Sequence, residues 1–401
     1  MKSIAVVSHM FPFGDMEDSF FDQEISALSE SNDLIFIPTA QRGIKRGMRF
    51  KDYADHVHRL SMGFSPSQFS LSRFRWVSYA MKTVINDVYR NERCVPKKSL
   101  VRGVLVIVAW IIMTPNGLLA AQLKSVYSLW GTDIGYYGKL LAGFFGVPLV
   151  VRFHRYDLYE DRGGAVPFNR SMFSEKTCTC VFLGEGALRH ANSIRTVSNS
   201  AVVPLFFDSP PPRRYRNTGK RMKINAMTIS SDAPVKRLDK IYEVLLTLKN
   251  DYGYEVAWKH CGLLRASASL FDSNYSSPIT CTYLGKLSQK KLLEALKSED
   301  VDFVVFMSES EGIPYSMVQA MSFGIPVFST NVGEIESLQV SGYDWLFEVD
   351  AEISQVAALI ANQLPLIRSA DVQEQLREAT RDSFGRRATL DEIEVLLGTR
   401  Q

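Results

Sequence analysis

Residues 308–334, SESEGIPYSMVQAMSFGIPVFSTNVGE, hold side chains suited to binding a polar ligand. Glu311 offers a carboxylate that can accept hydrogen bonds from sugar hydroxyls. Gly312 permits a tight or left-handed turn, and Pro314 suits the first turn of a helix. Backbone N–H groups at the start of a helix beginning near residue 315 would favour an anion such as a diphosphate. The segment therefore predicts a site for a phosphorylated or polyhydroxylated ligand.

The same segment has a purely structural alternative. Ser316, followed three residues later by Gln319, is a capping-box pattern that needs no ligand. Taken alone, the segment fits either a capped helix or a binding site.

A second segment, TISSDAPVKRLDKIYEVL at 228–245, has the pattern of strand, loop and helix. Lys236 and Arg237 stand at the predicted helix start, where the helix dipole disfavours cations. A bound polyanion between this loop and the first one would explain their placement. The alternative is a surface charge pair with Asp239.

Short apolar runs alternate with helix-like stretches along the whole chain, which is typical of an α/β protein with parallel sheets. The strands predicted in the first half are SIAVVSH, DLIFIPT, SVYSLWG, PLVVRFH, CVFLGEG and SIRTVSNS. Those predicted in the second half are KINAMTIS, YEVAWKHCG, ITCTYLG, VDFVVFM and GIPVFST.

The Pro-rich, basic stretch 208–221 lacks periodicity and predicts a linker between two doubly wound domains. We expect domains at 1–207 and 222–384. A C-terminal helix within 385–401 is expected to pack back on the first domain. Ligands in such folds bind beyond the carboxyl ends of the strands.

Composition sets limits on the class of protein. The 401 residues are 46% apolar and 22% charged, which is ordinary for globular domains. The five cysteines lack zinc-site spacing, so free thiols in a reducing cytosol are expected. The apolar run 104–113 is too short for a bilayer that needs about 20 residues, and the sequence predicts a soluble chain.

Residues 42–103 are strongly basic. They hold fourteen Lys or Arg against four acids, a local charge of +10 in a chain whose net charge is +3. Aromatic residues interleave these charges: Phe50, Phe69, Phe74, Trp76 and Tyr79. Such a surface can face anionic lipid headgroups or nucleic acid, or it can be a solvated helix face.

Several motifs together resemble one family. The loop around Glu311 followed by AMSFGIPVFSTNVG, with PVKRLD and the N-terminal FPFGDMEDSFFDQEI, looks like the retaining nucleotide-sugar glycosyltransferases of family 4. That resemblance implies the GT-B architecture, in which two Rossmann-like domains face each other across a cleft. VVRFHRYDLYED and YSLWGTD resemble the subset that builds bacterial capsule, O-antigen or exopolysaccharide units.

The resemblance implies roles for residues on the donor side. Glu311 matches the glutamate that contacts donor-sugar hydroxyls, and Lys236 matches the lysine that binds the pyrophosphate. Gly312, Ile313 and Pro314 match the turn whose amides approach the sugar and diphosphate. The other donor-side residues are Arg237, Ser316, Gln319 and Gly285.

On the acceptor side the resemblance implies three residues. His154 matches the family histidine near the transferred sugar, although a histidine that closes a strand is often only structural. Asp157 in the same loop could orient His154 or the sugar. Gly14 matches the N-terminal loop that faces the acceptor and the diphosphate.

Three positions depart from the family pattern. Gln319 stands where a second glutamate usually binds the ribose, and Ser231 where many members have an arginine. Glu334 stands where a second glycine is common. These departures bear on donor affinity, and Arg237 could substitute for the missing cation.

The resemblance implies transfer of a sugar from a nucleotide donor to a lipid-linked glycan with retention at the anomeric carbon. No cofactor and no metal are expected, although Asp300-Val-Asp302 has the spacing of a metal-binding DxD motif. The expected partners are a nucleotide sugar, a lipid-linked oligosaccharide and an anionic membrane surface, at the cytoplasmic face of the membrane. The alternatives are a catalytically impaired subunit of a polysaccharide assembly complex, a GT-B epimerase and a nucleic-acid-binding protein; no recognition motif supports the last.

Overall fold

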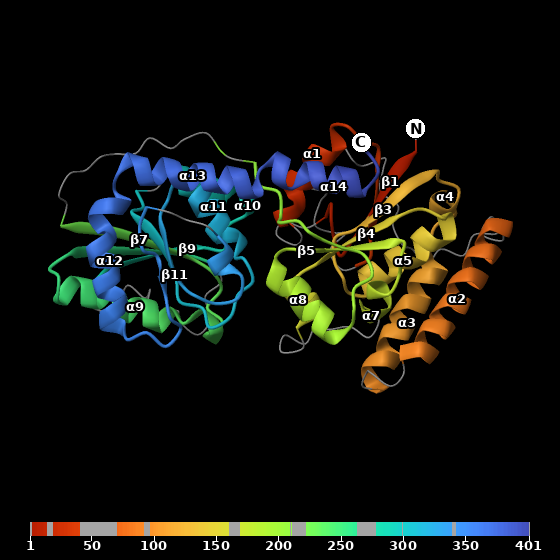
Figure 1. The fold of residues 1–401 in the computed structure, drawn as a ribbon, viewed down its shortest axis with the longest axis horizontal. Helices are drawn as coiled ribbons and strands as arrows, with labels where there is room; N and C mark the ends of the chain where they lie inside the picture. Colours follow the sequence, from red (N-terminus) through yellow and green to blue (C-terminus); the bar gives the residue numbers. More distant parts are fainter. Residues whose placement is uncertain are drawn as a thin grey trace. The chain divides into compact units, whose positions relative to one another are not determined.

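The computed structural model describes ten stretches of the chain: residues 2–13, 19–40, 70–91, 97–159, 169–208, 210, 222–262, 278–298, 300–338 and 342–400. The chain divides into two compact units. Unit 1 comprises Met1–Leu205 and Thr389–Gln401, and unit 2 comprises Phe206–Ala388. Figure 1 shows both units as α/β assemblies.

Unit 1 is built on a parallel sheet with the strand order β2-β1-β3-β4-β5-β6. Strands β1 to β5 are largely buried, because helices cover a parallel sheet on both faces and the strand sequences are rich in apolar residues, whereas the edge strand β6 is partly exposed. Their bounds are β1 Ser3–Ser8, β2 Leu34–Pro38, β3 Leu123–Ser128, β4 Leu149–Phe153, β5 Cys178–Phe182 and β6 Ser200–Val202.

Unit 2 has a second parallel sheet with the order β12-β11-β10-β7-β8-β9. Its core is formed by the β-branched and aromatic strand residues together with the inner faces of the helices. The strands are β7 Lys223–Ile229, β8 Glu255–Cys261, β9 Thr280–Gly285, β10 Phe303–Phe306, β11 Val327–Thr330 and β12 Leu346–Phe347.

The helices follow the strands in alternation. In unit 1 they are α1 Asp22–Ser29, α2 Leu71–Asn91, α3 Lys97–Met113, α4 Asn116–Leu119, α5 Asp133–Phe145, α6 Arg155–Leu158, α7 Asn169–Phe173, α8 Glu185–Ile194 and α14 Leu390–Leu396. In unit 2 they are α9 Leu238–Asn250, α10 Gln289–Ser298, α11 Tyr315–Ser322, α12 Ile353–Ile367 and α13 Ala370–Phe384. Short 3-10 turns are η1 Ser19–Phe21, η6 Pro234–Lys236, η8 Ile335–Ser337 and η9 Arg386–Ala388.

Each sheet has one point where the chain changes direction across the sheet. In unit 2, β7 is followed by β8 on one side, whereas β10 pairs with its other side. Because parallel crossovers are right-handed, α9 after β7 and α11 after β10 cover opposite faces of the sheet. In Figure 1 and in their contacts, α9 packs with α12 and α11 packs with α13. The loops after β7 and β10 therefore stand at the switch point of the strand order, where open α/β sheets bind their ligands.

The C-terminal residues 389–400 belong to unit 1. Helix α13 ends at Phe384, and α14 contacts α1. There the Ser31 hydroxyl donates a hydrogen bond to the Glu394 carboxylate at 3.0 Å.

Most predicted strands are confirmed, and two details are wrong. SIRTVSNS was predicted as a strand, but α8 continues to Ile194 and only Ser200 of that run lies in β6. The two-residue strand β12 was not predicted at all. The predicted linker falls almost wholly outside the described residues. Cys178, Cys180 and Cys261 are buried free thiols, as expected.

The basic segment is described only in part, because residues 41–69 and 92–96 lie outside the described stretches; Phe50 and Phe69 are among them. Its described remainder is the helix pair α2 and α3. The prediction that Trp76 faces a membrane is wrong: this side chain is fully buried, and its indole N–H donates to the Ile111 carbonyl at 3.0 Å. Phe74, in contrast, is exposed. No helix within the described stretches is long and apolar enough to cross a membrane.

Candidate functional site

The loops that follow β7 and β10 meet at the carboxyl edge of the unit 2 sheet. The two strands are direct neighbours, with Phe303 opposite Ala226. The backbone N–H of Glu309 donates to the Val235 carbonyl at 2.9 Å, so the two loops are hydrogen-bonded to each other. The two segments selected from the sequence therefore lie side by side in the fold.

Lys236 and Glu311 form an ion pair across these loops. Both side chains are largely shielded, with 22% of Lys236 and 12% of Glu311 exposed. A partly buried pair is screened less by solvent than a surface pair, so each charge is held in place by the other. The two residues expected to bind a diphosphate and a sugar thus contact each other.

Arg237 is held by two backbone carbonyls of unit 2. Its backbone is left-handed, with φ 48°. Its Nε donates to the Met307 carbonyl at 2.5 Å and its Nη1 to the Val349 carbonyl at 2.8 Å. The guanidinium therefore braces the segments after β10 and β12, and its contact with the donor stays a prediction. Its Nη2 is buried and has no hydrogen-bond partner among the described residues.

Helix α11 begins at Tyr315, as predicted, but the capping box is wrong. Pro314 is the N-cap residue, and no side chain caps the helix. The Ser316 hydroxyl donates to the Ile229 carbonyl at the end of β7, at 3.3 Å. Gln319 is 1% exposed, and its amide nitrogen has no hydrogen-bond partner among the described residues. Ser316 thus links α11 to the end of β7, and neither side chain serves as a helix cap.

Two glycines shape the turn around Glu311. Of the two turns that Gly312 permits, it does not adopt the left-handed one, and a Cβ there would meet no atom within 4 Å. Neither its backbone nor its described neighbours require glycine, so the open space is available to a ligand. Gly333 has φ 66°, and a Cβ there would lie 1.8 Å from the Glu311 carbonyl oxygen. Glycine at 333 is therefore required for the Glu311 loop to adopt its conformation.

Two further donor-side residues lie at the edges of this arrangement. Ile313 packs against the unit 2 core. Gly285 ends β9, two strands away from β7, and its φ of 77° explains the glycine without a ligand. One support was not anticipated: the Thr330 hydroxyl donates to the Ser308 carbonyl at 2.6 Å and links the end of β11 to the loop after β10.

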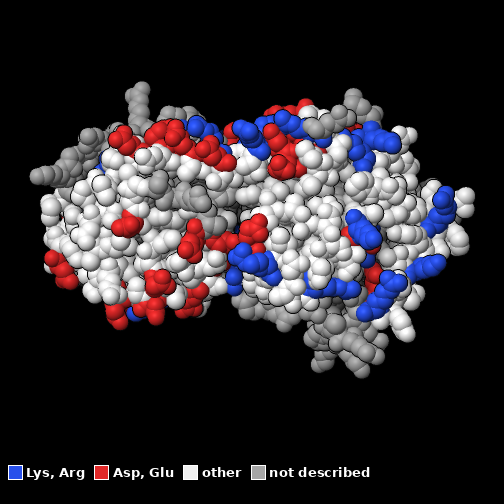
Figure 2. Space-filling view, in the orientation of Figure 1, with Lys and Arg blue, Asp and Glu red and all other residues white. Residues whose placement is uncertain are grey.

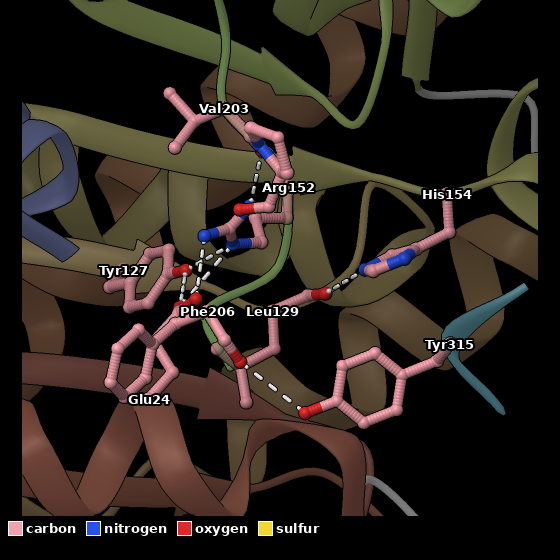
Figure 3. A network of polar contacts seen from close by, with 9 residues as sticks. Glu24, Tyr127, Leu129, Arg152, His154, Val203, Phe206 and Tyr315 are labelled. Atoms are coloured by element: carbon pink, nitrogen blue, oxygen red, sulfur yellow. Dashed lines mark hydrogen bonds and ion pairs between the residues drawn. The ribbon is translucent and has the colours of Figure 1, made fainter. Parts of the chain in front are cut away.

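In unit 1, His154 follows the carboxyl end of β4. Its Nε2 donates to the Leu129 carbonyl at 3.1 Å, which leaves Nδ1 as the acceptor (Figure 3). The rings of Phe20, Phe21 and Trp130 surround it, with Trp130 at 4.6 Å between centroids. Burial lowers the pKa of His154 to about 3. The imidazole is therefore neutral near pH 7 and can act only as a hydrogen-bonding group.

The Asp157 carboxylate binds the backbone of the loop that carries His154. It accepts the backbone N–H of His154 at 2.9 Å and that of Gly131 at 3.0 Å. The residue is fully buried, and burial raises its pKa to about 7. It therefore fixes the backbone of the loops after β3 and β4, and its place on the acceptor side stays a prediction. Gly14, the other acceptor-side residue, lies outside the described stretches.

A buried polar network beside His154 was missed in the sequence. Arg152 and Glu24 are both fully buried and form an ion pair at 2.6 Å. Tyr127 contacts both, and the Arg152 Nη1 also donates to the Val203 carbonyl at 2.8 Å (Figure 3). An arginine inside the apolar run VVRFH was the available signal, because a buried charge needs a partner. The network fixes the strand end that carries His154.

The DxD-like pair has a structural role. Asp302 pairs with Arg368 at 3.0 Å and accepts the backbone N–H of Asn225, and Asp300 accepts the Asn225 side chain. These contacts lie before β10 begins, at the end of the sheet opposite the Lys236–Glu311 pair. Within the described stretches, no group of acidic, histidine or cysteine side chains is arranged to hold a metal ion.

Comparison with known families identifies the domain type. Residues 217–382 match the family model described as "Glycosyl transferases group 1". Residues 217–382, most of unit 2, are therefore similar to group 1 glycosyltransferase domains, which is the similarity that the predicted enzyme class requires. No curated protein matches the chain.

Solved structures share the fold. HepE from Anabaena, in complex with UDP and glucose, aligns over 100% of both chains with a TM-score of 0.63 and 13% identity. Sucrose-phosphate synthase from Thermosynechococcus elongatus aligns over 99% of this chain and 98% of its own, with a TM-score of 0.67 and 12% identity. S. aureus TarM, in complex with UDP, Fondaparinux and alpha-GlcNAc-glycerol, aligns with a TM-score of 0.53 and 17% identity. That alignment covers 68% of this chain and 55% of TarM, so the chain spans about half the length of TarM. The predicted GT-B fold is confirmed.

Proposed function

We propose that this protein is a retaining glycosyltransferase that moves a sugar from a nucleotide-sugar donor to a lipid-linked glycan in surface polysaccharide biosynthesis. The observation that carries the proposal is the meeting of Lys236 and Glu311 at the switch point of the unit 2 sheet. A cation for phosphate and a carboxylate for sugar hydroxyls stand there at the expected place for a ligand. UDP in HepE and in TarM supports UDP as the first nucleotide to test.

In the proposed reaction, the donor diphosphate takes over Lys236 and releases Glu311 to accept hydroxyls of the donor sugar. The bond between the anomeric carbon and the diphosphate oxygen breaks, and the acceptor oxygen bonds to that carbon on the same face. The acceptor's proton passes to the departing phosphate. Lys236 and the uncapped N-terminus of α11 stabilise the charge that develops on the diphosphate. No cofactor takes part.

His154 in unit 1 would contribute a neutral imidazole near the transferred sugar. Its Nε2 is bound to the Leu129 carbonyl, and its ring also belongs to the capping box at the start of α6. Its low pKa keeps the imidazole neutral at physiological pH. We place the enzyme in the cytoplasm, at the inner face of the cytoplasmic membrane, where lipid-linked acceptors are found.

Binding of UDP and of a panel of UDP-sugars to the full chain tests the donor assignment. A ligand that binds the folded state raises its thermal midpoint in proportion to its affinity. The wild type should be stabilised, and Lys236→Ala should lose most of this shift. Lys240→Ala, a change to an exposed lysine on α9, should behave as the wild type. Equal UDP binding by the wild type and Lys236→Ala would contradict the assignment.

A second candidate function is a glycosyltransferase-like subunit that binds a donor without turning it over. Gln319 in place of the family acid favours this candidate, as does the occupation of Lys236 by Glu311. Donor hydrolysis distinguishes the two: the proposed enzyme slowly releases sugar to water, whereas the subunit binds UDP-sugar and releases none.

A further inference from the structure

Half of the large exposed hydrophobic side chains in the described stretches lie on two helices of unit 1. The fourteen such residues include seven on α2 and α3: Leu71, Phe74, Ile85, Tyr89, Val101, Leu105 and Ile112. Their exposed fractions run from 50% for Ile112 to 82% for Tyr89. Contiguous apolar surface of this kind marks a site of interaction with a protein or a membrane.

The spacing of these residues places them on one face of each helix. On α2, Phe74, Ile85 and Tyr89 follow Leu71 at intervals that keep them within about a third of the helix circumference. On α3, Val101, Leu105 and Ile112 follow one another at intervals of four and seven residues, again on one face. Each helix therefore presents an apolar stripe outward, opposite its buried face.

The two helices form an antiparallel pair that is firmly attached to unit 1. The start of α2 is bound to the end of α3, because the Arg73 guanidinium donates to the Ile112 carbonyl at 3.1 Å and Trp76 donates to the Ile111 carbonyl. Trp76 also contacts the rings of Tyr137 and Phe144 of α5, at 6.2 and 5.3 Å between centroids. The inner faces are thus packed, and the exposed stripes are not a consequence of loose packing.

The charges around the stripes are of one sign. Arg75, Lys82, Arg90 and Arg102 are exposed on these helices. The single acid in their described residues, Asp87, is buried and paired with Lys139 at 2.8 Å. Figure 2 shows basic side chains set among uncharged ones over this part of unit 1.

We propose that the outward face of α2 and α3 binds the surface of an anionic lipid bilayer, with the apolar stripes buried at the level of the acyl-chain boundary and the cations at the headgroups. An apolar stripe bordered by Lys and Arg without exposed acids is the pattern of helices that lie in the membrane interface. At 17 residues α3 is shorter than the roughly 20 needed for a span, and α2, at 21 residues, is not apolar enough to cross a membrane, so both helices would lie in the plane of the membrane.

Charge argues against a second copy of the chain as the occupant. A symmetric contact between two copies of this face would place the cations of one opposite those of the other, and like charges across an interface oppose association. A bilayer with anionic lipids matches both the apolar stripes and the positive border. This surface does not depend on the donor chemistry proposed for unit 2.

Sedimentation of the full chain with vesicles tests the proposal. Vesicles of phosphatidylcholine alone are compared with vesicles that contain one part in three of phosphatidylglycerol. We expect the wild type to bind the anionic vesicles. The double variant Phe74→Ser/Leu105→Ser should bind them roughly tenfold more weakly or worse, because two apolar anchors are lost. The matched control Leu366→Ser/Val395→Ser alters two side chains elsewhere, each 48% exposed, and should bind as the wild type.

The charged border has its own variant, Arg75→Gln/Lys82→Gln. Its binding should be weaker at low salt and should converge on that of the wild type at high salt, because salt screens the charges it removes. UDP-induced thermal shifts should be the same in all these variants, so a failure of the donor assignment would be seen separately.

Equal binding of the wild type and Phe74→Ser/Leu105→Ser to anionic vesicles would overturn the proposal. It would also be overturned if light scattering showed a dimer that this double variant abolishes, with no vesicle binding by the wild type.

Discussion

The ion pair between Lys236 and Glu311 predicts that Glu311→Gln binds UDP more tightly than the wild type. In the structure the cation assigned to the diphosphate is engaged by a carboxylate. A diphosphate that takes Lys236 must disrupt this pair and approach the negative charge of Glu311. Glutamine keeps the size of the side chain and removes both obstacles.

The size of the effect follows from the burial of the pair. Two unit charges 4 Å apart attract by about 4 kcal/mol at an effective dielectric constant near 20. Desolvation and side-chain ordering cancel most of this, and exposed pairs retain about 0–1 kcal/mol. With 22% and 12% of the two side chains exposed, the pair lies near the upper end of that range. A gain of about 1 kcal/mol corresponds to a five- to tenfold lower Kd for UDP.

Titration calorimetry with UDP measures this change. Glu309→Gln is the matched control, because it removes a charge from the same loop at an exposed position without breaking the pair. The variant Glu311→Gln should also lose most of its turnover, since the carboxylate for the sugar is gone. Weaker UDP binding by Glu311→Gln than by the wild type would refute the reasoning.

Three further predictions concern stability and the donor. Glu24→Gln should lower the free energy of unfolding in urea by about 3–5 kcal/mol, because Arg152 would remain buried and charged without its partner; a smaller loss than 1 kcal/mol would contradict this. Gln319→Glu should change the donor KM by less than about tenfold and should change kcat little. If the wild type is inactive and Gln319→Glu is active, the protein is instead the non-catalytic glycosyltransferase-like subunit. Because the pKa of His154 is lowered to about 3 in the folded state, the unfolded chain takes up the extra proton first as pH falls. The contribution of His154 to the free energy of unfolding is therefore full above about pH 6.5 and is lost progressively toward pH 3. When the pH is lowered from 7 to 5, the free energy of unfolding of His154→Gln should therefore fall by about 2 kcal/mol less than that of the wild type.

The sheets could be predicted because each long strand is a run of β-branched or aromatic residues bounded by polar turns. Strand β12 could not be predicted, because its two residues, Leu346 and Phe347, are too few to show an alternation of apolar and polar side chains. Residues 193–200 were wrongly predicted as a strand because they show a short alternation of apolar and polar residues. The first two of these residues belong to helix α8, which ends at Ile194. The local sequence pattern predicts an element poorly when that element is only one helical turn or one strand bridge long.

The site could be predicted in outline for a topological reason. Glu311 and Lys236 both follow strands, and strand order brings those two loops together. The sequence could not show that Arg237 adopts φ 48° and donates to two backbone carbonyls. Such roles depend on backbone geometry and on residues distant in the chain, here Met307 and Val349, which no local spacing records.

The interleaved aromatic and basic residues of α2 lie on two different faces of the helix, one buried and one exposed. Trp76 and Phe74 are two residues apart in a stretch of interleaved aromatic and basic residues, and both were assigned to a lipid surface. A helix turns about 100° per residue, so side chains two positions apart point in widely different directions. Trp76 shares its face with Ala80 and Val84, which are buried, whereas Phe74 shares its face with Ile85. Helical spacing, had it been applied to each residue, would have separated them.

The central claim is that this chain transfers sugar from a nucleotide donor with retention, and nuclear magnetic resonance of the donor tests it most directly. The full chain is incubated with a panel of UDP-sugars, and the anomeric proton of the first-formed product is followed together with release of UDP. The account predicts UDP release from at least one donor, a product with the anomeric configuration of that donor, and loss of both signals in Lys236→Ala. A product of inverted configuration, or turnover that is unchanged in Lys236→Ala, would contradict it.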